Sequence, residues 1–248
     1  AGQEAIVVLD NVFIPNELIF MNGEVEYAAM LVERFTCYHR RSYVCKTGLG
    51  DVLIGAAAAI SDYNGIPDVS HIREKLVEMT HLNESIFAAG ILSSYQAQEM
   101  KSGVWLNDDM LANVCKHNVT RFPYEISRLA QDIAGGIVVT MPSEKDFRNP
   151  VTGPMLKKYL AGRNGVDVEN RMRILRLIEN MTLGRNAVGY LTESMHGAGS
   201  PQAQRIQIAR QMQLGYKKNL AKNLAKVNDK EESKENSEYF KRVFKITK

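Results

Sequence analysis

Long stretches with apolar residues at helical spacing constrain the fold of this chain more than any other feature. From Glu24 to Tyr63, apolar side chains recur three or four positions apart, which is the period of one helix face. Further helices are expected at residues 70–101, 108–141, 168–196 and 201–227. Long helices joined by short connections bury their apolar faces best when they pack side by side in alternating directions. The sequence therefore predicts a mainly α protein, an antiparallel helical bundle.

Three regions fall outside the expected helices. Residues 4–14 hold two short β-branched, apolar runs before a proline, and they predict a short β segment. Residues 142–165 contain three prolines and three glycines and are expected to form a long connection. Residues 228–248 begin with a dense run of charges, typical of a solvated tail or a docking arm. Since a domain rarely begins inside a strand, we expect the chain to be the downstream part of a longer protein.

The composition narrows the classes of partner and compartment. The formal net charge is +3, and the cationic residues are interleaved with acidic ones, so no nucleic-acid-binding patch is indicated. The three cysteines form no C-x-x-C pair and no disulfide framework, which favours a reduced, cytoplasmic compartment. No apolar run reaches the length of a membrane span, so no membrane association is expected.

A first group of chemically active side chains lies in residues 35–48, FTCYHRRSYVCKTG. His39 and Tyr43 are four positions apart and share a helix face. His39 and Cys45 are six positions apart, which leaves them roughly 120° apart around an ideal helix. Both can bind one metal ion only if the helix is interrupted between them; otherwise they are a packed histidine and a buried cysteine. Two protein ligands are also too few for an iron–sulfur cluster or a structural zinc ion.

A second group lies in an apolar segment expected to be helical. Gln131 is followed four positions later by Gly135-Gly136. Glycines are unfavourable inside a helix, and they usually permit a close approach by another backbone or by a ligand. This pattern leaves cofactor binding and helix packing as equal alternatives.

A third group lies near residue 195. Glu193 and His196 are three positions apart on one helix face, just before Gly197 ends the expected helix. Ser200 is expected to cap the next helix, whose free N–H groups suit an anion. Helix–turn–helix packing explains the glycine, serine and proline here, but it does not explain a carboxylate and an imidazole together at a helix end.

Taken together, several longer motifs resemble one flavoprotein family. They are QEAIVVLDNVFIPN, YHRRSY, LVEMTHLNE, NVTRFPYEI and TESMHGAGSPQAQRI. They are similar to 4-hydroxybutyryl-CoA dehydratase/vinylacetyl-CoA Δ-isomerase, a relative of the flavin-dependent 4-hydroxyphenylacetate 3-hydroxylases on an acyl-CoA-dehydrogenase-like fold. The resemblance covers residues 1–227. It implies the end of a middle β domain at residues 1–20 and a C-terminal helical domain at residues 21–227, followed by the charged tail at 228–248.

The resemblance also implies an activity. Enzymes of this family dehydrate 4-hydroxybutyryl-CoA to crotonyl-CoA and shift the double bond of vinylacetyl-CoA, using FAD and a [4Fe–4S] cluster that flank the substrate. A base removes the α-proton, the flavin takes one electron, and the cluster helps the hydroxyl group to leave. The implied partners are the acyl-CoA substrate, the N-terminal half of the same enzyme, and further copies in a homodimer or homotetramer. Without that N-terminal half, the chain is expected to bind no cluster and to complete no turnover.

Roles at individual positions follow only from the resemblance. His39 matches a cluster ligand and a candidate base, and Cys45 matches one of three cysteine ligands. The remaining catalytic positions implied are Glu4, Tyr43, Lys46 and Glu193. The positions implied to contact FAD are Gln131, Gly135, Gly136, His196, Gly197 and Ser200.

One departure from the family pattern keeps other functions open. The family separates the histidine and the cysteine by seven positions, with Gly-Gly before the cysteine, whereas this chain has Val44 and one residue fewer. The other two cysteine ligands belong to the N-terminal half, and Cys37 and Cys115 do not match them. The alternatives are a flavin-only isomerase or hydroxylase, and a non-catalytic helical subunit that serves assembly.

Overall fold

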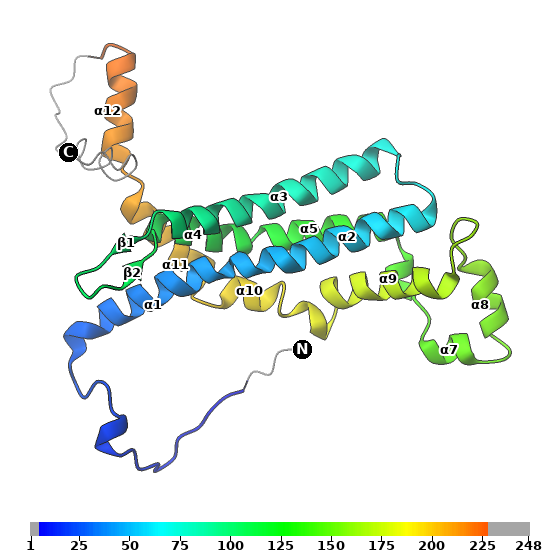
Figure 1. Ribbon diagram of the computed structural model, residues 1–248, viewed down its shortest axis with the longest axis horizontal. Coiled ribbons are helices and arrows are strands. Elements are labelled where there is room, and N and C mark those ends of the chain that lie inside the picture. The colour runs from blue at the N-terminus through cyan, green and yellow to red at the C-terminus, as the bar shows by residue number, and fades with distance from the viewer. Residues whose placement is uncertain (1–4, 228–248) are drawn as a thin grey trace. The chain divides into compact units, whose positions relative to one another are not determined.

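The computed structural model describes residues 5–227 (Figure 1). It divides into two units, one ending at Gln204 and one beginning at Arg205. The long helices of the first unit are α1 (Ala28–Ser42), α2 (Lys46–Asn64), α3 (Ser70–Tyr95), α4 (Asp109–Val119), α5 (Phe122–Ala134) and α9 (Val168–Thr182). Its short helices are α6 (Ile137–Thr140), α7 (Glu144–Arg148), α8 (Gly153–Tyr159) and α10 (Thr192–His196). Helix α11 (Pro201–Gln211) crosses the division, and α12 (Leu214–Leu224) lies in the second unit.

The prediction of a mainly α bundle is confirmed. Helices α2, α3, α5 and α9 pack against one another, and Figure 1 shows the first three running side by side. Their shared core consists of aliphatic side chains, among them Leu53, Ile60, Met79, Ile126, Leu175 and Ile178. A smaller core joins α3 and α4 to the 3₁₀ turn Tyr43–Cys45, which links α1 to α2. That smaller core fixes Tyr43, which is only 4% exposed.

Several expected helices are shorter than predicted because specific residues interrupt them. The stretch 108–141 forms α4, α5 and α6 rather than one helix. Pro123, in the first turn of α5, has no N–H and cannot continue a helix from α4. Gly135 then ends α5 with φ +76°, a conformation that glycine adopts without strain. The stretch 201–227 is likewise divided, at Gln213 with φ +49°.

The other boundaries differ from expectation for similar local reasons. The stretch 70–101 ends at Tyr95 and is followed by an antiparallel pair of short strands, β1 (Gln98–Glu99) and β2 (Trp105–Leu106). The stretch 168–196 is divided into α9 and α10 by a 3₁₀ turn, Arg185–Ala187. The expected connection at 142–165 contains α7 and α8. Helix α7 begins with a capping box in which Ser143 and Asp146 bond each other's backbone N–H groups.

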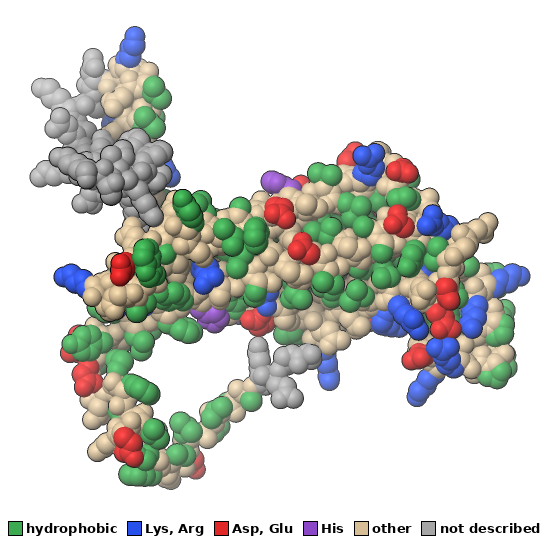
Figure 2. Space-filling model, viewed as in Figure 1, with side chains coloured by type: hydrophobic (Ala, Val, Ile, Leu, Met, Phe, Trp, Pro, Cys, Tyr) green, Lys and Arg blue, Asp and Glu red, His purple; other side chains and the backbone are tan. Residues whose placement is uncertain are grey.

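The β segment predicted at residues 4–14 is wrong for the described part of that range. Residues 5–14 form no strand, and their apolar side chains are exposed, as in Ile6 (94%) and Phe13 (86%). Figure 2 shows these apolar side chains along the segment that precedes α1. A strand needs a neighbour to satisfy its N–H and C=O groups, and the described chain offers none there. Residue 4 and the tail at 228–248 lie outside the described residues.

One helical stretch, Val25–Asn64, meets the length and composition of a membrane span, with 39% of its apolar window buried inside the protein. No span was expected from the sequence, but α1 and α2 continue each other through the 3₁₀ turn at Tyr43 and form one long helical stretch. The α2 part of this stretch packs against α3, α5 and α9. Packing in the bundle core therefore accounts for part of its apolar character.

Candidate active site

Two donors from the start of the bundle converge on one carboxylate near its end. The Tyr43 hydroxyl donates a hydrogen bond to Glu193 Oε1 at 2.9 Å. Lys46 Nζ donates to Glu193 Oε2 at 2.8 Å and to the carbonyl oxygen of Gly189 at 2.7 Å. These are three of the residues predicted as catalytic, and the fold brings them together from about 150 positions apart. Glu193 with its donors Tyr43 and Lys46 is called the Glu193 site below.

Local structure explains why both donors point the same way. Tyr43 and Lys46 are three positions apart, on either side of the junction between the 3₁₀ turn and α2, so they share a face. Glu193 lies in the first turn of α10. At the other end of α10, a Cβ atom on Gly197 would overlap the Tyr43 hydroxyl. The glycine is therefore required if Tyr43 is to reach Glu193.

The electrostatics of the site keep Glu193 ionised. Burial acts to raise the pKa of Glu193, but the hydrogen bonds from Lys46 and Tyr43 and the charges of Lys46 and Lys116 outweigh it and lower the pKa. Burial alone would raise this pKa, so the two donors and the two lysine charges decide its direction. At neutral pH the side chain is a carboxylate that can accept a proton.

Lys116 belongs to the same region, and the sequence analysis did not identify it. Its side chain is 0% exposed, and its Nζ donates hydrogen bonds to the carbonyl oxygens of Ser194 and Met195 in α10. The same Nζ lies 4.1 Å from the centre of the Tyr43 ring. Burial lowers the pKa of Lys116 to about 8. A lysine in a helical sequence normally reads as solvent-exposed, so no sequence signal distinguished it.

His39 lies one helical turn before Tyr43. Its ring centre is 5.3 Å from that of Tyr43 and 5.2 Å from that of Phe35, so the imidazole stands between two aromatic rings. Its Nδ1 atom is buried without a hydrogen-bond partner among the described residues. A buried imidazole nitrogen without a partner is an unsatisfied polar group, which makes His39 a candidate for a role in proton transfer.

The cysteines divide into one accessible and two buried thiols. Cys45 is exposed, whereas Cys37 and Cys115 are buried, and burial raises the pKa of each of these two to about 12. The 3₁₀ turn advances about 120° per residue rather than about 100°, which brings Cys45 about 60° closer to the direction of His39 than a continuous helix would. The interruption that a shared metal site requires is therefore present.

The described residues do not complete a cluster site. Residues 5–227 hold no group of three or more His, Cys, Asp or Glu side chains arranged to bind a metal ion. His39 and Cys45 provide an imidazole and an accessible thiol, two donors of suitable chemistry, whereas a [4Fe–4S] cluster takes four.

The predicted flavin-binding residues lie in two places. Gln131 is half-buried near the end of α5, and its Nε2 donates to the carbonyl oxygen of Thr182 at 3.4 Å. Gly135 and Gly136 are exposed, and a Cβ atom on either would meet nothing within 4 Å. Their backbone is therefore accessible to a ligand, and the glycines do not serve helix packing within the described chain.

The remaining predicted residues lie in the turn after α10. His196 and Ser200 are exposed. Between them Ala198 adopts φ +58°, an uncommon conformation for a residue with a side chain. Arg40 Nε donates to the carbonyl oxygen of Ala198 at 3.0 Å, and Arg40 Nη1 donates to Asn113 at 2.8 Å. The turn is thus tied to α1, and through it to α4.

A cavity of about 240 Å³ adjoins the Glu193 site. Its lining includes Lys46, a member of that site, and Gly189, whose carbonyl oxygen accepts a hydrogen bond from Lys46. The other lining residues are Leu49, Met181, Arg185, Asn186 and Tyr190. The Tyr190 hydroxyl is buried without a hydrogen-bond partner among the described residues. A small molecule in this cavity would lie beside the Lys46 ammonium.

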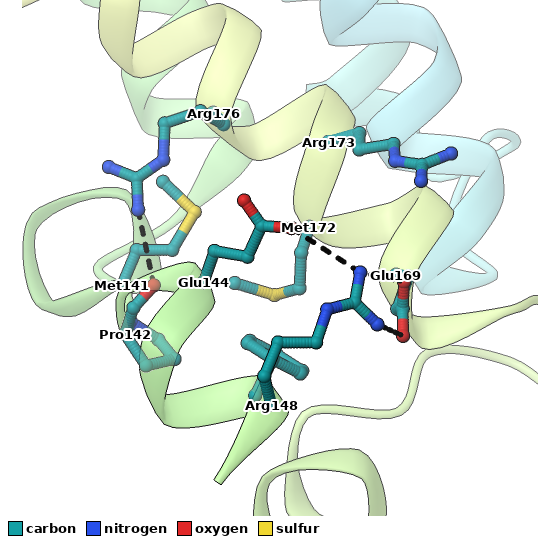
Figure 3. Close-up of a pocket in the computed structure, with 9 residues that line it drawn as sticks. Met141, Pro142, Glu144, Arg148, Glu169, Met172, Arg173 and Arg176 are labelled. Carbon is teal, nitrogen blue, oxygen red and sulfur yellow. Dashed lines mark hydrogen bonds and ion pairs between the residues drawn. The ribbon is translucent and has the colours of Figure 1, made fainter. Parts of the chain in front are cut away.

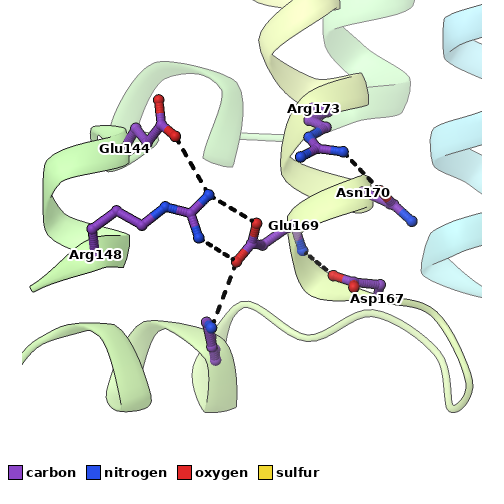
Figure 4. Close-up of polar contacts among 7 residues, drawn as sticks. Glu144, Arg148, Asp167, Glu169, Asn170 and Arg173 are labelled. Atoms are coloured by element: carbon purple, nitrogen blue, oxygen red, sulfur yellow. Dashed lines mark hydrogen bonds and ion pairs between the residues drawn. The ribbon is translucent and has the colours of Figure 1, made fainter. Parts of the chain in front are cut away.

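A second cavity of about 240 Å³ lies between α7 and α9 (Figure 3). Arg148 lines this cavity and bonds Glu169 through both terminal nitrogens, at 3.0 and 3.2 Å, and Glu144 at 3.4 Å (Figure 4). Lys157 Nζ lies 3.5 Å from Glu169. Glu144, Arg148, Lys157 and Glu169 are called the Arg148 network below. Its ion pairs to Glu169 cross-link α7 and α8 to α9. Because the charges of the network pair with one another, its role is structural.

Comparison with known proteins places this geometry in a family. Residues 28–226 match the family described as 4-hydroxyphenylacetate 3-hydroxylase C terminal. The 4-hydroxybutyryl-CoA dehydratase/vinylacetyl-CoA-Δ-isomerase of Clostridium aminobutyricum is 56% identical over 230 residues, which are 89% of this chain and 47% of that protein.

Solved structures agree with this assignment. The oxygen-tolerant archaeal 4-hydroxybutyryl-CoA dehydratase from N. maritimus is 83% identical with a TM-score of 0.90, covering 96% of this chain and 48% of that one. The oxygenase component of 4-hydroxyphenylacetate 3-monooxygenase complexed with FAD is 25% identical with a TM-score of 0.76, covering 90% of this chain and 48% of that one. The chain thus spans about half the length of these relatives. It belongs to the 4-hydroxyphenylacetate 3-hydroxylase C-terminal family.

Proposed function

We propose that this chain is the C-terminal half of a 4-hydroxybutyryl-CoA dehydratase/vinylacetyl-CoA Δ-isomerase and that it acts with an N-terminal half. The observation that carries the proposal is the bonding of Tyr43 and Lys46 to the Glu193 carboxylate. Identities of 56% and 83% to proteins named for this dehydratase support it. The proposed enzyme is cytoplasmic and is a homodimer or homotetramer.

The proposed chemistry needs two groups that handle protons, because dehydration and double-bond migration both move hydrogen between carbon atoms. Glu193 is ionised and accepts a proton from the substrate, while Tyr43 and Lys46 hold its two oxygens in place. His39, with its unpaired Nδ1 beside the Tyr43 ring, is the second group. Glu4 is a further carboxylate of this proposal, and it lies outside the described residues.

FAD is the proposed cofactor. The accessible backbone of Gly135 and Gly136, with Gln131 one turn before them, fits a ligand or a neighbouring subunit that carries one. His196, Gly197 and Ser200 are proposed to face the flavin from the turn after α10. A related oxygenase component solved with FAD supports this choice. When bound, FAD supplies reversible acceptance of an electron, which makes an unactivated C–H bond acidic.

A [4Fe–4S] cluster is the second proposed cofactor. His39 and Cys45 would supply two of its four protein ligands, and the N-terminal half would supply the others. When bound, the cluster supplies a Lewis acid for the departing hydroxyl group. The chain alone is therefore expected to be inactive.

The deciding experiment is anaerobic co-production of this chain with the N-terminal half of the N. maritimus dehydratase. The assembly is assayed for iron, for its absorption spectrum, and for turnover of 4-hydroxybutyryl-CoA and vinylacetyl-CoA. The proposal predicts flavin bands, iron and both activities. Production of this chain alone is the control, and it should show none of the three.

Two other results would favour the alternatives. Flavin bands without iron would support a flavin-only isomerase or hydroxylase. An assembly with neither cofactor nor activity would support a non-catalytic helical subunit. Each result would refute the dehydratase proposal.

A further inference from the structure

Lys116 is the most completely buried cation that the described chain brings near the Glu193 site. No part of its side chain is exposed, although it carries an ammonium group in a helix otherwise built for packing. Its Nζ bonds to the carbonyl oxygens of Ser194 and Met195, which directly follow Glu193. It also lies over the ring of Tyr43, the residue that bonds Glu193 from the other side. A single side chain thus contacts both the backbone that carries the carboxylate and one of its donors.

Burial of an ammonium group is costly, so the surrounding contacts must offset that cost. Taking a charge out of water is unfavourable unless hydrogen bonds and opposite charges compensate, and an apolar side chain of similar size often stabilises such a position better. Here two carbonyl oxygens, the face of an aromatic ring and the nearby Glu193 carboxylate provide the compensation. All of these partners belong to the Glu193 site or to the backbone beside it.

We propose that Lys116 is a positioning residue of the Glu193 site. Its ammonium group fixes the short helix α10 at Ser194 and Met195 and holds the Tyr43 ring, so that Tyr43 and Lys46 can both bond the Glu193 carboxylate. Lys116 acts through these residues and does not touch the substrate. The proposal deepens the proposed function and rests on it.

The charges around Lys116 support this role. The groups that face it are Glu193 on α10, Lys46 on α2, Arg40 on α1 and the Cys115 thiol on its own helix. Burial lowers the pKa of Lys116 most, the Lys46 and Arg40 charges lower it further, and Glu193 opposes them. The coupling is reciprocal, since the positive charge of Lys116 also lowers the pKa of Glu193. Removing that charge should therefore raise the pKa of Glu193.

The test compares Lys116→Met and Lys116→Gln in the enzyme assembled with its N-terminal half. Gln keeps N–H donors for the two α10 carbonyls but has no charge, and Met has neither. For Lys116→Met we expect kcat on vinylacetyl-CoA to fall about 100-fold through misplacement of Glu193, with KM changed less than about twofold. In both variants the acid limb of the pH–rate profile should move to higher pH. Lys101→Met, in the exposed turn between β1 and β2, is the matched control and should change neither quantity.

An acid limb that stays in place in Lys116→Gln would overturn the proposal, as would an unchanged kcat in Lys116→Met. Failure of both variants to assemble would also count against it, because Lys116 would then be needed for folding rather than for positioning.

A second measurement separates this proposal from the proposed function. The lowered pKa of Glu193 contributes stability above the pKa of the unfolded chain, and that stability is lost as pH falls through the folded value. With that pKa raised toward the unfolded value, the acid loss of stability in Lys116→Gln should be smaller and should be complete at a higher pH than in the wild type. An inactive wild-type assembly would refute the proposed function, while this displacement in thermal unfolding would still support the role of Lys116, and its absence would refute it.

Discussion

The Glu193 site and the Arg148 network both join distant segments through ion pairs beside a cavity, yet their surroundings differ. The side chains of Lys46 and Glu193 are 13% and 31% exposed, whereas those of Arg148 and Glu169 are 56% and 26% exposed. In the Arg148 network, Glu144, Arg148 and Glu169 line the second cavity and their charges satisfy one another (Figures 3 and 4). The Glu193 site adds a buried lysine and a glycine whose replacement by a larger residue would displace Tyr43. An ion pair alone therefore does not mark a functional site. Features beside it that are unfavourable for stability, such as a buried ammonium group, are the better indication.

The largest effect that separates the two regions is expected from Glu193→Gln. The amide keeps the shape of the carboxylate but cannot accept a proton from carbon, so proton exchange should fall about 1,000-fold or more in the assembled enzyme. Flavin absorbance should be unchanged. Solvent deuterium incorporation into the acyl-CoA measures the exchange.

The matched control for that change is Glu169→Gln in the Arg148 network, which removes a paired carboxylate that is 26% exposed. It should leave the exchange rate unaltered. An active Glu193→Gln enzyme, or an equal loss in Glu169→Gln, would remove the distinction drawn between the two regions.

A smaller effect is expected from Gly197→Ala. The new methyl group would overlap the Tyr43 hydroxyl, so Tyr43 must move and its bond to Glu193 Oε1 must lengthen or break. We expect a loss of about 10- to 100-fold in kcat and a lower free energy of unfolding by about 1–3 kcal/mol. Turnover assays and chemical denaturation measure the two quantities.

Gly55→Ala is the control for the steric argument. Gly55 lies within α2, and a Cβ atom there would meet nothing within 4 Å, so alanine should leave activity unchanged and stabilise the helix by about 0.5–1 kcal/mol. Normal activity in Gly197→Ala would show that Tyr43 does not need its present position.

The fold class could be predicted from the sequence, because helical periodicity is a local property of the residues. The boundaries were less predictable: Pro123 and Gly135 divide a stretch whose apolar spacing continues across them. The β segment expected before α1 is absent from residues 5–14, because a strand also depends on a neighbouring strand that a local pattern does not show. Periodicity thus predicts helices more reliably than strands, because a helix forms its backbone hydrogen bonds internally and a strand forms them with a neighbouring strand.

The candidate site was predictable only in part, and for a related reason. Tyr43, Lys46 and Glu193 were identified through a family resemblance, and the structure explains why those three meet. Lys116 was missed because nothing in its sequence neighbourhood shows that its side chain is buried. Burial alone would raise the pKa of Glu193, and its two donors and the nearby lysine charges reverse that direction. Contacts between segments 78 to 150 positions apart decide both properties, and no local pattern carries them.

The smallest effect is expected in the Arg148 network itself. Arg148→Met removes the bonds to Glu144 and Glu169, but exposed ion pairs contribute little because water screens them. The unfolding midpoint should fall only slightly, and the difference from the wild type should shrink at about 1 M salt, where charges are screened within about 3 Å. Lys46→Met should instead abolish activity at every salt concentration, because its partly buried ammonium bonds Glu193 directly. Thermal unfolding and turnover at low and high salt test the contrast. A large, salt-insensitive loss in Arg148→Met would show that this network, too, is buried in the assembled enzyme and has a role beyond cross-linking α7 and α9.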